Sequence, residues 1–255
     1  LSLRGSGREP DPPPPPPGGG AYRSKCSRVP DPHRRGVYFS PEGVRRSIEE
    51  SLERLGLDRI DIAYLHDPDD HLDQAIAEGC PELVRLRAAG VVGAIGVGMN
   101  QAQAPARFVR ETDIDAVLLA GRYTLLDQRG LAELLPLAER RGVSVVVGGA
   151  FNSGLLADPK PGATFDYVAA SDELVSRALG LKEVCERHGV PLRAAALRFP
   201  FGHPAVASVL VGTRTADEVR DAATMLRHPV PDVLWTELKE RGLLPADVPT
   251  PGEAG

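Results

Sequence analysis

Apolar residues recur along the chain with helical and strand spacing in turn, which predicts alternating helices and strands from residue 40 onward. Ser40 suits a helix cap, Pro41 suits a first helical turn, and the apolar positions behind them repeat at helical spacing as far as Gly56. These apolar positions are Val44, Ile48, Leu52 and Leu55. We therefore expect an amphipathic helix between Ser40 and Gly56.

A short apolar run with β-branched residues follows at residues 60–65, and a polar cluster comes directly after it. The cluster consists of His66, Asp67, Pro68, Asp69, Asp70 and His71. This order is typical of a buried strand whose carboxyl end leads into a polar loop.

The same unit of strand, loop and helix repeats along the rest of the chain. Further strands are predicted at residues 92–97, 116–119, 143–147 and 206–211. Further helices are predicted at residues 83–90, 104–110, 131–140, 171–188 and 192–199, and Thr215 with Glu218 forms a capping box that opens another. This alternation predicts an α/β fold with right-handed crossovers and a parallel sheet covered by helices. Five strands are predicted, whereas a closed (β/α)₈ barrel needs eight.

The first 28 residues differ in kind from the rest. They contain a proline run from Pro12 to Pro17 followed by three glycines, with little to bury. Prolines lack the backbone donor and glycines cost more to order, so an extended, disordered arm is expected at residues 1–28. A solvated tail and a segment for a proline-binding partner both fit this composition. We expect the folded part at residues 29–249 and a short tail at 250–255.

Composition narrows the classes of function. The 255 residues are 42% hydrophobic and 25% charged, with a formal net charge of -5 and no clustered surplus of Lys and Arg. A general nucleic-acid binder is therefore not expected. The longest apolar run, at residues 143–151, is far shorter than the roughly 20 residues that span a bilayer, and no apolar signal core opens the sequence. We expect a cytoplasmic protein that does not enter membranes.

Neither cysteines nor the acidic loop indicate a metal site. Cys26, Cys80 and Cys185 are odd in number and widely separated, so no disulfide framework and no thiolate metal site is expected. The carboxylates and imidazoles of residues 66–71 suit a hard cation by type. Consecutive residues of one loop rarely converge on a single ion, however, so we expect a solvated loop there.

Five stretches, in this order, carry a resemblance to a known family. They are RSIEESLERLGLDRIDIAYLHDPDD (46–70), GVVGAIGVGMNQ (90–101), LLAGRYTLLDQ (118–128), GAFNSGLLA (149–157) and HPAVASVLVGTRTADEV (203–219). Over residues 29–249 the chain resembles the aldo/keto reductases, within them the branch that contains L-fucose dehydrogenase and D-threo-aldose 1-dehydrogenase. The resemblance implies a TIM-barrel oxidoreductase that moves hydride between NAD or NADP and an aldose or aldehyde.

The resemblance also implies roles for single residues. His66 matches the family's catalytic histidine at a strand end, where an imidazole orients and polarises the substrate oxygen. Asn100 matches the asparagine that holds the nicotinamide carboxamide, with Met99 in place of the commoner serine. Ala120 stands where many relatives have a glutamine, and Gly148 where a tyrosine often stacks on the ring; both departures resemble the sugar-dehydrogenase branch.

Two loops match the family's phosphate-binding segments. The matching residues are Gly149, Phe151, Asn152 and Ser153 in one loop and Gly212, Thr213 and Arg214 in the other. Independently of the family, glycine lets backbone approach a phosphate, and the helix capped by Thr215 directs free N–H groups at an anion. Arg214 could pair with the 2′-phosphate of NADP, but Asp217 and Glu218 would disfavour it. NAD is slightly preferred because the branch favours it.

Two aromatic residues have less specific roles. Tyr123, just after a predicted strand, is either an aromatic wall of the substrate pocket or part of the packing. Trp235, the single tryptophan, is expected to anchor a C-terminal helix together with Leu234 and Leu238.

The chain departs from the family at its N-terminal end. The resemblance places three strands before Val29, with the catalytic aspartate, the tyrosine acid/base and its lysine, where this chain has the proline-rich arm. Tyr22 and Lys25 match that pair only by residue type. Two hypotheses follow. In one, the chain is a reductase whose true N-terminal part differs from residues 1–28 or comes from another chain. In the other, it is a non-catalytic remnant that at most binds nucleotide. An open barrel would also expose sheet edges through which copies could self-associate.

Overall fold

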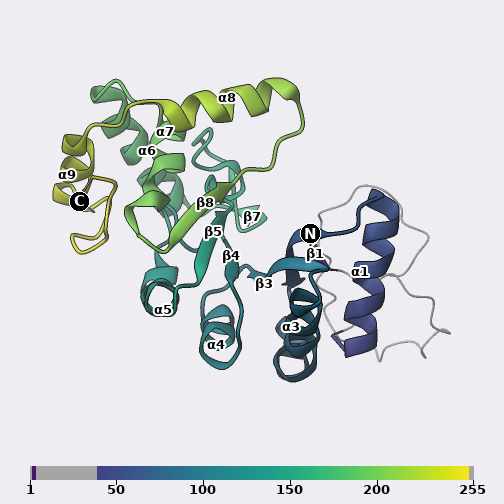
Figure 1. Ribbon diagram of the computed structural model, residues 1–255. Coiled ribbons are helices and arrows are strands. Elements are labelled where there is room, and N and C mark those ends of the chain that lie inside the picture. The colour runs from purple at the N-terminus through teal and green to yellow at the C-terminus, as the bar shows by residue number, and fades with distance from the viewer. Residues whose placement is uncertain (1, 4–38, 253–255) are drawn as a thin grey trace, which may run out of the picture.

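A parallel sheet runs through the described part of the chain, which in this computed structural model comprises residues 2–3 and 39–252 (Figure 1). Its order is β1-β2-β3-β4-β5-β8, and every neighbouring pair is parallel. The strands are β1 (Ser2–Leu3), β2 (Ile60–His66), β3 (Val92–Met99), β4 (Ala116–Ala120), β5 (Ser144–Gly148) and β8 (Val206–Leu210). All five predicted strands are confirmed, because each is a local run of apolar residues long enough to be recognised.

Helices connect these strands. They are α1 (Pro41–Leu55), α2 (Leu72–Gln74), α3 (Cys80–Ala88), α4 (Gln103–Glu111), α5 (Leu134–Arg141), α6 (Asp172–Arg187), α7 (Leu192–Arg198), α8 (Ala216–Arg227) and α9 (Asp232–Glu240). The predicted caps are present. The hydroxyl of Ser40 accepts the N–H of Gly43 at 3.2 Å, and Gly56 ends α1 in the left-handed conformation with φ +64°.

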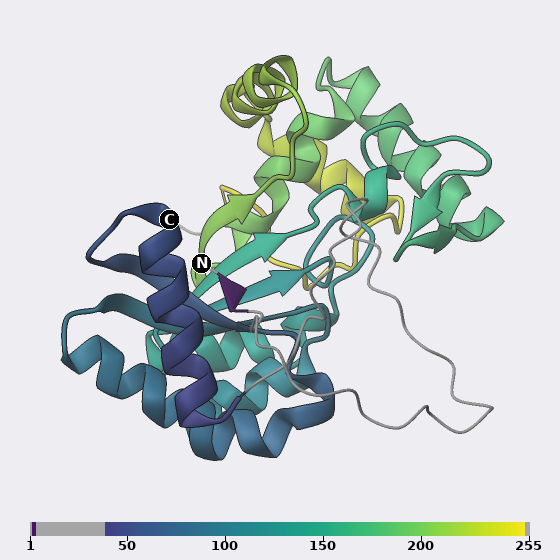
Figure 2. The same ribbon diagram turned by 90° about the vertical axis from the view of Figure 1, so that its right-hand side faces the viewer.

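Helices α3, α4 and α5 lie beside one another along the sheet, as both views show (Figures 1 and 2). Helix α1 packs on α3, and the two are joined through Glu82, whose buried carboxylate pairs with Arg45 of α1 at 2.8 Å. Buried apolar residues of the strands and helices form one continuous core, with Val97, Val117 and Val145 at its centre in three adjacent strands. This core holds the carboxyl ends of the strands at a common edge.

The sheet does not close on itself within the described residues, since β1 and β8 stand at its two edges. Beside β8, helix α8 buries none of its residues, and Leu210 and Val219 are 53% and 52% exposed. This agrees with the prediction of an incomplete (β/α)₈ barrel with about five of its eight strands.

The structure describes only part of the two predicted terminal segments. Of the predicted arm at residues 1–28 the structure describes Ser2–Leu3 alone, as a two-residue strand paired with Tyr64 and Leu65; the rest lies outside the described residues. At the other end Thr250 is buried, so packed chain continues to at least that residue. None of the described helices has the length and apolarity needed to cross a membrane.

Candidate active site

The sheet brings the predicted site residues to one edge. His66 is the last residue of β2, Asn100 follows the last residue of β3, and Gly149 follows β5. Gly212 lies two residues beyond β8. Parallel strands present their carboxyl ends on the same side, and in (β/α)₈ barrels that side carries the active site. Segments up to 146 residues apart in sequence are therefore gathered at one edge of the sheet.

Backbone strain concentrates on the same side. Among the described residues, those other than glycine with positive φ are Asp67, Asn152, Ser153, Asp166 and Tyr167. All five lie in the segments that follow β2 and β5. Such conformations cost on the order of 1 kcal/mol or more and cluster at functional sites. The pattern supports this edge as the functional one.

His66 lies beside Asp67 and Gly98 at the end of its strand. Its Nε2 lies 3.2 Å from Oδ2 of Asp67, and its side chain is 31% exposed. Across the sheet it pairs with Gly98 of β3, where a Cβ would lie 3.7 Å from Nδ1. The imidazole is thus placed at the edge, partly open to a ligand.

The loop after β3 presents Asn100 to solvent, while the preceding Met99 is buried in the core. Met99 therefore provides packing where a serine would offer a hydroxyl. The next residue, Gln101, donates its side-chain amide to Asp69, which ties this loop to the one that follows His66. His66 and Asn100 consequently stand on two linked loops.

The two departures from the family's pattern are direct neighbours. Ala120 and Gly148 pair in register at the ends of β4 and β5, and a Cβ at Gly148 would lie 3.7 Å from the Cβ of Ala120. Neither residue has a polar side chain. The exposed amide of Asn100 is therefore the remaining predicted partner for a carboxamide at this edge.

The loop after β5 is held by its own side chains. Asn152 is buried; its Oδ1 accepts the hydroxyl of Thr124 at 2.6 Å and its Nδ2 donates to the carbonyl of Gly121 at 3.4 Å. The hydroxyl of Ser153 accepts the N–H of Tyr167 at 3.3 Å. The side chain of Asn152 therefore holds the loop in place, and its part in phosphate binding stays a prediction.

Gly149 shapes the backbone of this loop. Gly149 has φ +63° and is exposed, and a Cβ there would lie 3.2 Å from the backbone nitrogen of Gly121. Glycine is thus needed both for the turn and for the close approach of the two loops. Phe151 is half-buried and packs against the core, which anchors the loop.

The loop after β8 is exposed and leads into α8. Gly212 has open space around it, and Thr213 and Arg214 are exposed. The hydroxyl of Thr215 accepts the N–H of Glu218 at 3.2 Å, which confirms the predicted capping box. This loop is therefore open at Gly212, while the N–H of Glu218 is taken by the cap.

Glu218 already neutralises part of this loop. Its Oε2 accepts the backbone N–H of Arg214 at 2.6 Å, and its Oε1 lies 3.3 Å from the Arg214 guanidinium. The pKa of the Glu218 carboxyl lies below its ordinary value, chiefly because of the backbone hydrogen bond from Arg214. A negative charge thus stands beside Arg214 at neutral pH.

Tyr123 lies in the core. Its ring is fully buried, 5.2 Å from the ring of Phe199 and 6.2 Å from that of His203. Burial raises the pKa of its hydroxyl above the ordinary value. The burial of this side chain agrees with the packing alternative, and a place for Tyr123 in the wall of the substrate pocket stays a prediction. Trp235 is buried in α9 against Phe199, as expected of a helix anchor.

Replacing Tyr123 by phenylalanine is expected to stabilise the protein. The Tyr123 hydroxyl has no hydrogen-bond partner within the described residues, so removing it relieves a desolvation cost of about 1 kcal/mol. Thermal unfolding should show a higher midpoint for Tyr123→Phe. The matched control is Tyr64→Phe in β2, whose hydroxyl is not a buried unsatisfied atom and whose loss should bring no gain. A lower midpoint for Tyr123→Phe would contradict the expectation.

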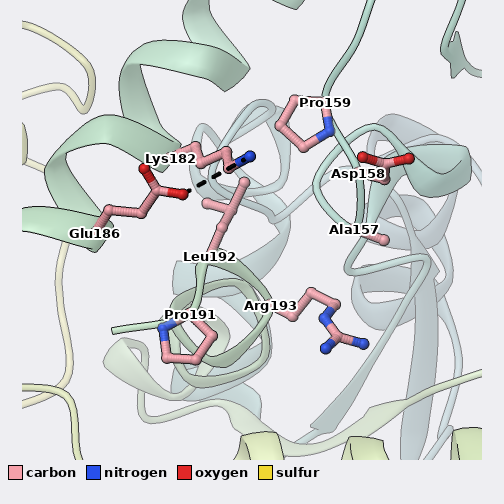
Figure 3. A pocket seen from close by; sticks show the side chains of 8 residues that line it. All are labelled: Ala157, Asp158, Pro159, Lys182, Glu186, Pro191, Leu192 and Arg193. Atoms are coloured by element: carbon pink, nitrogen blue, oxygen red, sulfur yellow. Dashed lines mark ion pairs between the residues drawn. The ribbon is translucent and has the colours of Figure 1, made fainter. Parts of the chain in front are cut away.

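A small pocket lies away from this edge, between the loop at residues 157–159 and helices α6 and α7 (Figure 3). Its volume of about 210 Å³ is below that of most ligand sites. Its charged side chains are already paired: Lys182 with Glu186 at 3.7 Å, Asp158 with Lys160 at 2.5 Å, and Arg193 with Asp221 at 2.5 Å. None of its residues belongs to the predicted site.

No group of three or more His, Cys, Asp or Glu side chains that could hold a metal ion occurs in residues 39–252. Cys80 and Cys185 are free and buried, and burial raises the pKa of each thiol to about 12. These thiols are therefore protonated packing residues. Tyr22, Lys25 and Cys26 lie outside the described residues.

Known proteins resemble this chain in sequence and in structure. The model of the aldo/keto reductase family matches residues 23–241. The chain belongs to this family. It is 45% identical to D-threo-aldose 1-dehydrogenase of a Pseudomonas species over 85% of this chain and 67% of that protein. It is 41% identical to pyridoxal 4-dehydrogenase of Microbacterium luteolum over 81% of this chain and 64% of that protein.

Solved structures agree with the family assignment. The holo form of an aldo-keto reductase from Bacillus halodurans superimposes with a TM-score of 0.66 and 25% identity, over 83% of this chain and 70% of that one. A glycerol dehydrogenase from Gluconobacter oxydans, at 20% identity and a TM-score of 0.65, shows the same fold. The chain spans about two thirds of the length of the curated relatives that it matches.

Sequence reasoning missed two features of this edge. One is the carboxylate of Asp67 beside His66, which the sequence placed only in a polar loop. The other is the ion pair of Arg122 with Asp166 at 2.8 Å, which joins the loop after β4 to the hairpin formed by β6 (Thr164–Phe165) and β7 (Val168–Ala169). A local signal existed for the first, since Asp is among the few residues that tolerate positive φ; none existed for the second.

Proposed function

We propose that this protein is an NAD(P)-dependent oxidoreductase that oxidises an aldose at its anomeric carbon or reduces an aldehyde in the reverse direction. The observation that carries the proposal is the convergence of His66, Asn100 and two glycine-containing loops on one edge of the sheet. Membership of the family and the names of two relatives, one for an aldose and one for pyridoxal, support the same class of reaction. L-fucose is the first substrate to test.

The bound nicotinamide would supply the hydride acceptor or donor, and the chain's own residues would position it and the substrate. In this proposal Asn100 holds the carboxamide through its exposed amide, and the backbones of the loops at Gly149 and Gly212 receive the phosphates. The imidazole of His66 orients the substrate oxygen by a hydrogen bond. Ser153 donates its hydroxyl proton to a phosphate in this proposal, since the hydroxyl oxygen accepts the N–H of Tyr167 and the O–H is not used by that contact.

NAD is the proposed cofactor in preference to NADP. The 2′-phosphate of NADP carries additional negative charge, and the one arginine of the loop after β8 is already paired with Glu218. A phosphate placed beside Arg214 would have to displace that carboxylate or stand next to it. The repulsion between two neighbouring negative charges would weaken the binding of NADP relative to NAD.

Glu218→Gln is expected to strengthen NADPH binding relative to NADH by roughly three- to tenfold, because it removes the charge that competes for Arg214. The measurement is a fluorescence titration of both cofactors with wild type and variant. Asp221→Asn is the matched control: Asp221 lies further along α8 and pairs with Arg193 at 2.5 Å, so its neutralisation should leave the ratio nearly unchanged. An unchanged ratio in Glu218→Gln would remove Glu218 from cofactor selection.

The alternative is a nucleotide-binding chain without turnover. The open sheet of the described residues favours it, since β1 supplies only two residues at the edge where a closed barrel would continue. A titration with NADH and NADPH, beside an assay with L-fucose and NAD, separates the two functions. Turnover supports the oxidoreductase; binding without turnover supports the alternative; a folded chain that binds neither cofactor refutes both.

A cytoplasmic location and self-association through the exposed sheet edges are also part of this proposal. The free, buried thiols of Cys80 and Cys185 are consistent with a reducing compartment.

The exposed apolar residues Leu210 and Val219 beside the β8 edge support association between copies. Sedimentation velocity over a range of protein concentrations tests this self-association.

A further inference from the structure

Thr124 joins the loop after β4 to the loop after β5 from inside the protein. Its side chain is fully buried, and its hydroxyl donates to Oδ1 of Asn152 at 2.6 Å. The same hydroxyl oxygen accepts the N–H groups of Leu126 at 3.2 Å and of Asp127 at 3.1 Å. A hydroxyl has one proton and two acceptor lone pairs, so these three hydrogen bonds use its whole capacity. Thr124 is therefore held in one orientation, with its proton directed at Asn152.

The amide of Asn152 is held at both of its polar atoms. Its Oδ1 accepts the hydroxyl of Thr124, and its Nδ2 donates to the carbonyl oxygen of Gly121 at 3.4 Å. Both partners belong to the loop after β4, 28 and 31 residues earlier in the chain. Asn152 is only 2% exposed, so these hydrogen bonds are shielded from water. The side chain of Asn152 thus ties the loop after β5 to the loop after β4.

The backbone at Asn152 changes hand. Phe151 has φ −95°, whereas Asn152 and Ser153 have φ +45° and +57°. Such a change turns successive N–H groups to one side, an arrangement that binds anions in many proteins. Positive φ has a cost for a residue with a side chain, and the hydrogen bonds of the Asn152 amide offset it. The exposed Ser153 therefore follows a turn that a buried side chain stabilises.

We propose that Thr124 is a positioning residue for the cofactor, which holds Asn152 and through it the backbone at Ser153 in the shape that receives the phosphates. Thr124 itself does not touch the cofactor. A loop that is already ordered loses less conformational freedom when a ligand binds, so the contact raises cofactor affinity. The assignment of a nicotinamide cofactor to this loop rests on the proposed function, whereas the contact between Thr124 and Asn152 does not.

Two substitutions separate the hydroxyl of Thr124 from the bulk of its side chain. Thr124→Val keeps the branching and nearly the volume of threonine but removes the hydroxyl, whereas Thr124→Ser keeps the hydroxyl. Thr112→Val is the matched control. The hydroxyl of Thr112 donates to the carbonyl of Phe108 at 2.7 Å at the end of α4. This position precedes the first residue of β4 and so lies at the end of the sheet opposite to the candidate site.

The first measurement is a fluorescence titration with NADH and NADPH. Thr124→Val is expected to weaken the binding of both cofactors by the same factor, roughly five- to tenfold, because both carry the pyrophosphate. Thr124→Ser and Thr112→Val should bind both cofactors with nearly wild-type affinity. Circular dichroism at the same temperature shows whether each variant is folded. Wild-type affinity in folded Thr124→Val would overturn the proposal.

Asn152→Gly tests the same contact from the other side. Glycine adopts positive φ without cost from a side chain, so this variant keeps the turn and is expected to fold even if Thr124→Val does not. It removes the acceptor of the Thr124 hydroxyl, and a loss of affinity of at least five- to tenfold is expected. Where both single variants fold, the double variant should bind no more weakly than Asn152→Gly, because both substitutions break one contact. Additive losses, or wild-type affinity in Asn152→Gly, would contradict the proposal.

Steady-state kinetics separates positioning of the cofactor from a general loss of structure. Thr124→Val is expected to raise KM for NAD by the same five- to tenfold while kcat stays nearly unchanged, since His66 stands at the end of a different strand. Thr124→Ser should restore the wild-type KM. A lower kcat at unchanged KM would refute a role in cofactor binding.

Hydrogen exchange without cofactor separates this inference from the proposed function. Mass spectrometry should show faster exchange of the backbone N–H groups of residues 149–156 in Thr124→Val than in wild type, with Thr124→Ser resembling wild type. Equal exchange in Thr124→Val and wild type would overturn the positioning role. If the wild-type chain binds neither cofactor, the proposed function fails and the cofactor part of this inference fails with it, while the exchange series still decides whether Thr124 holds the loop.

Discussion

Replacing His66 by alanine is expected to lower turnover by roughly 10²- to 10⁴-fold while the cofactor dissociation constant stays nearly the same. The imidazole stands at the carboxyl end of β2, partly exposed, next to the Asp67 carboxylate and beside Gly98 of β3. The phosphate-binding loops follow β5 and β8 and do not include it. The loss should therefore fall on the chemical step, measured as kcat beside a fluorescence titration with NADH.

His228→Ala is the matched control for this loss. His228 lies just beyond α8, where its Nδ1 is 2.9 Å from the carbonyl oxygen of Pro229, and it has no place at the candidate site. Its replacement should leave turnover at the wild-type level. Equal activity in His66→Ala and wild type would remove His66 from the reaction and leave cofactor binding as the function best supported.

Replacing Gly96 by alanine is expected to destabilise the sheet by about 3 kcal/mol or more. Gly96 lies in the middle of β3, and a Cβ built there would be 2.1 Å from the backbone oxygen of Ala116 in β4. It would also lie 3.0 Å from Cδ1 of Tyr64 in β2. Because backbone cannot move aside as a flexible side chain can, the strands would have to separate.

Gly98→Ala provides the control in the same strand. Its Cβ would meet only the side chains of Leu118 at 3.6 Å and His66 at 3.7 Å, which are ordinary contact distances. Urea unfolding followed by circular dichroism should give a much lower midpoint for Gly96→Ala than for Gly98→Ala. Equal midpoints would mean that β3 and β4 can separate at Gly96 without loss of stability, which would contradict the expected clash.

These glycines show how far local pattern can predict the fold. The run at residues 92–97 was predicted as a strand although glycine is disfavoured there, because its apolar residues outweigh this. The reason for glycine at position 96 lies in the neighbouring strand β4. A sequence pattern does not contain the distance between two strands.

Helix boundaries, too, could be predicted from the sequence only where a local signal marks them. Helix α1 was predicted closely because Ser40 and Gly56 are local signals of its two ends. Helix α5 begins at Leu134, three residues later than predicted, because a 3₁₀ turn at Arg129–Leu131 precedes it. The helical segment at α2 and residues 75–79 was missed, since sparse apolar residues follow the acidic loop there.

The sequence by itself determined the order of elements, the family and the positions of His66, Asn100 and the two glycine-containing loops, because each follows a recognisable strand. Only the tertiary structure decided what the side chains do. Asn152 is occupied by Thr124 and Tyr123 is enclosed by Phe199 and His203, through contacts between residues far apart in the chain. Even between adjacent residues, the meeting of Asp67 with His66 depends on a left-handed turn held against the next strand. Spacing in a sequence specifies periodicity, whereas burial and partners depend on how the periodic elements pack.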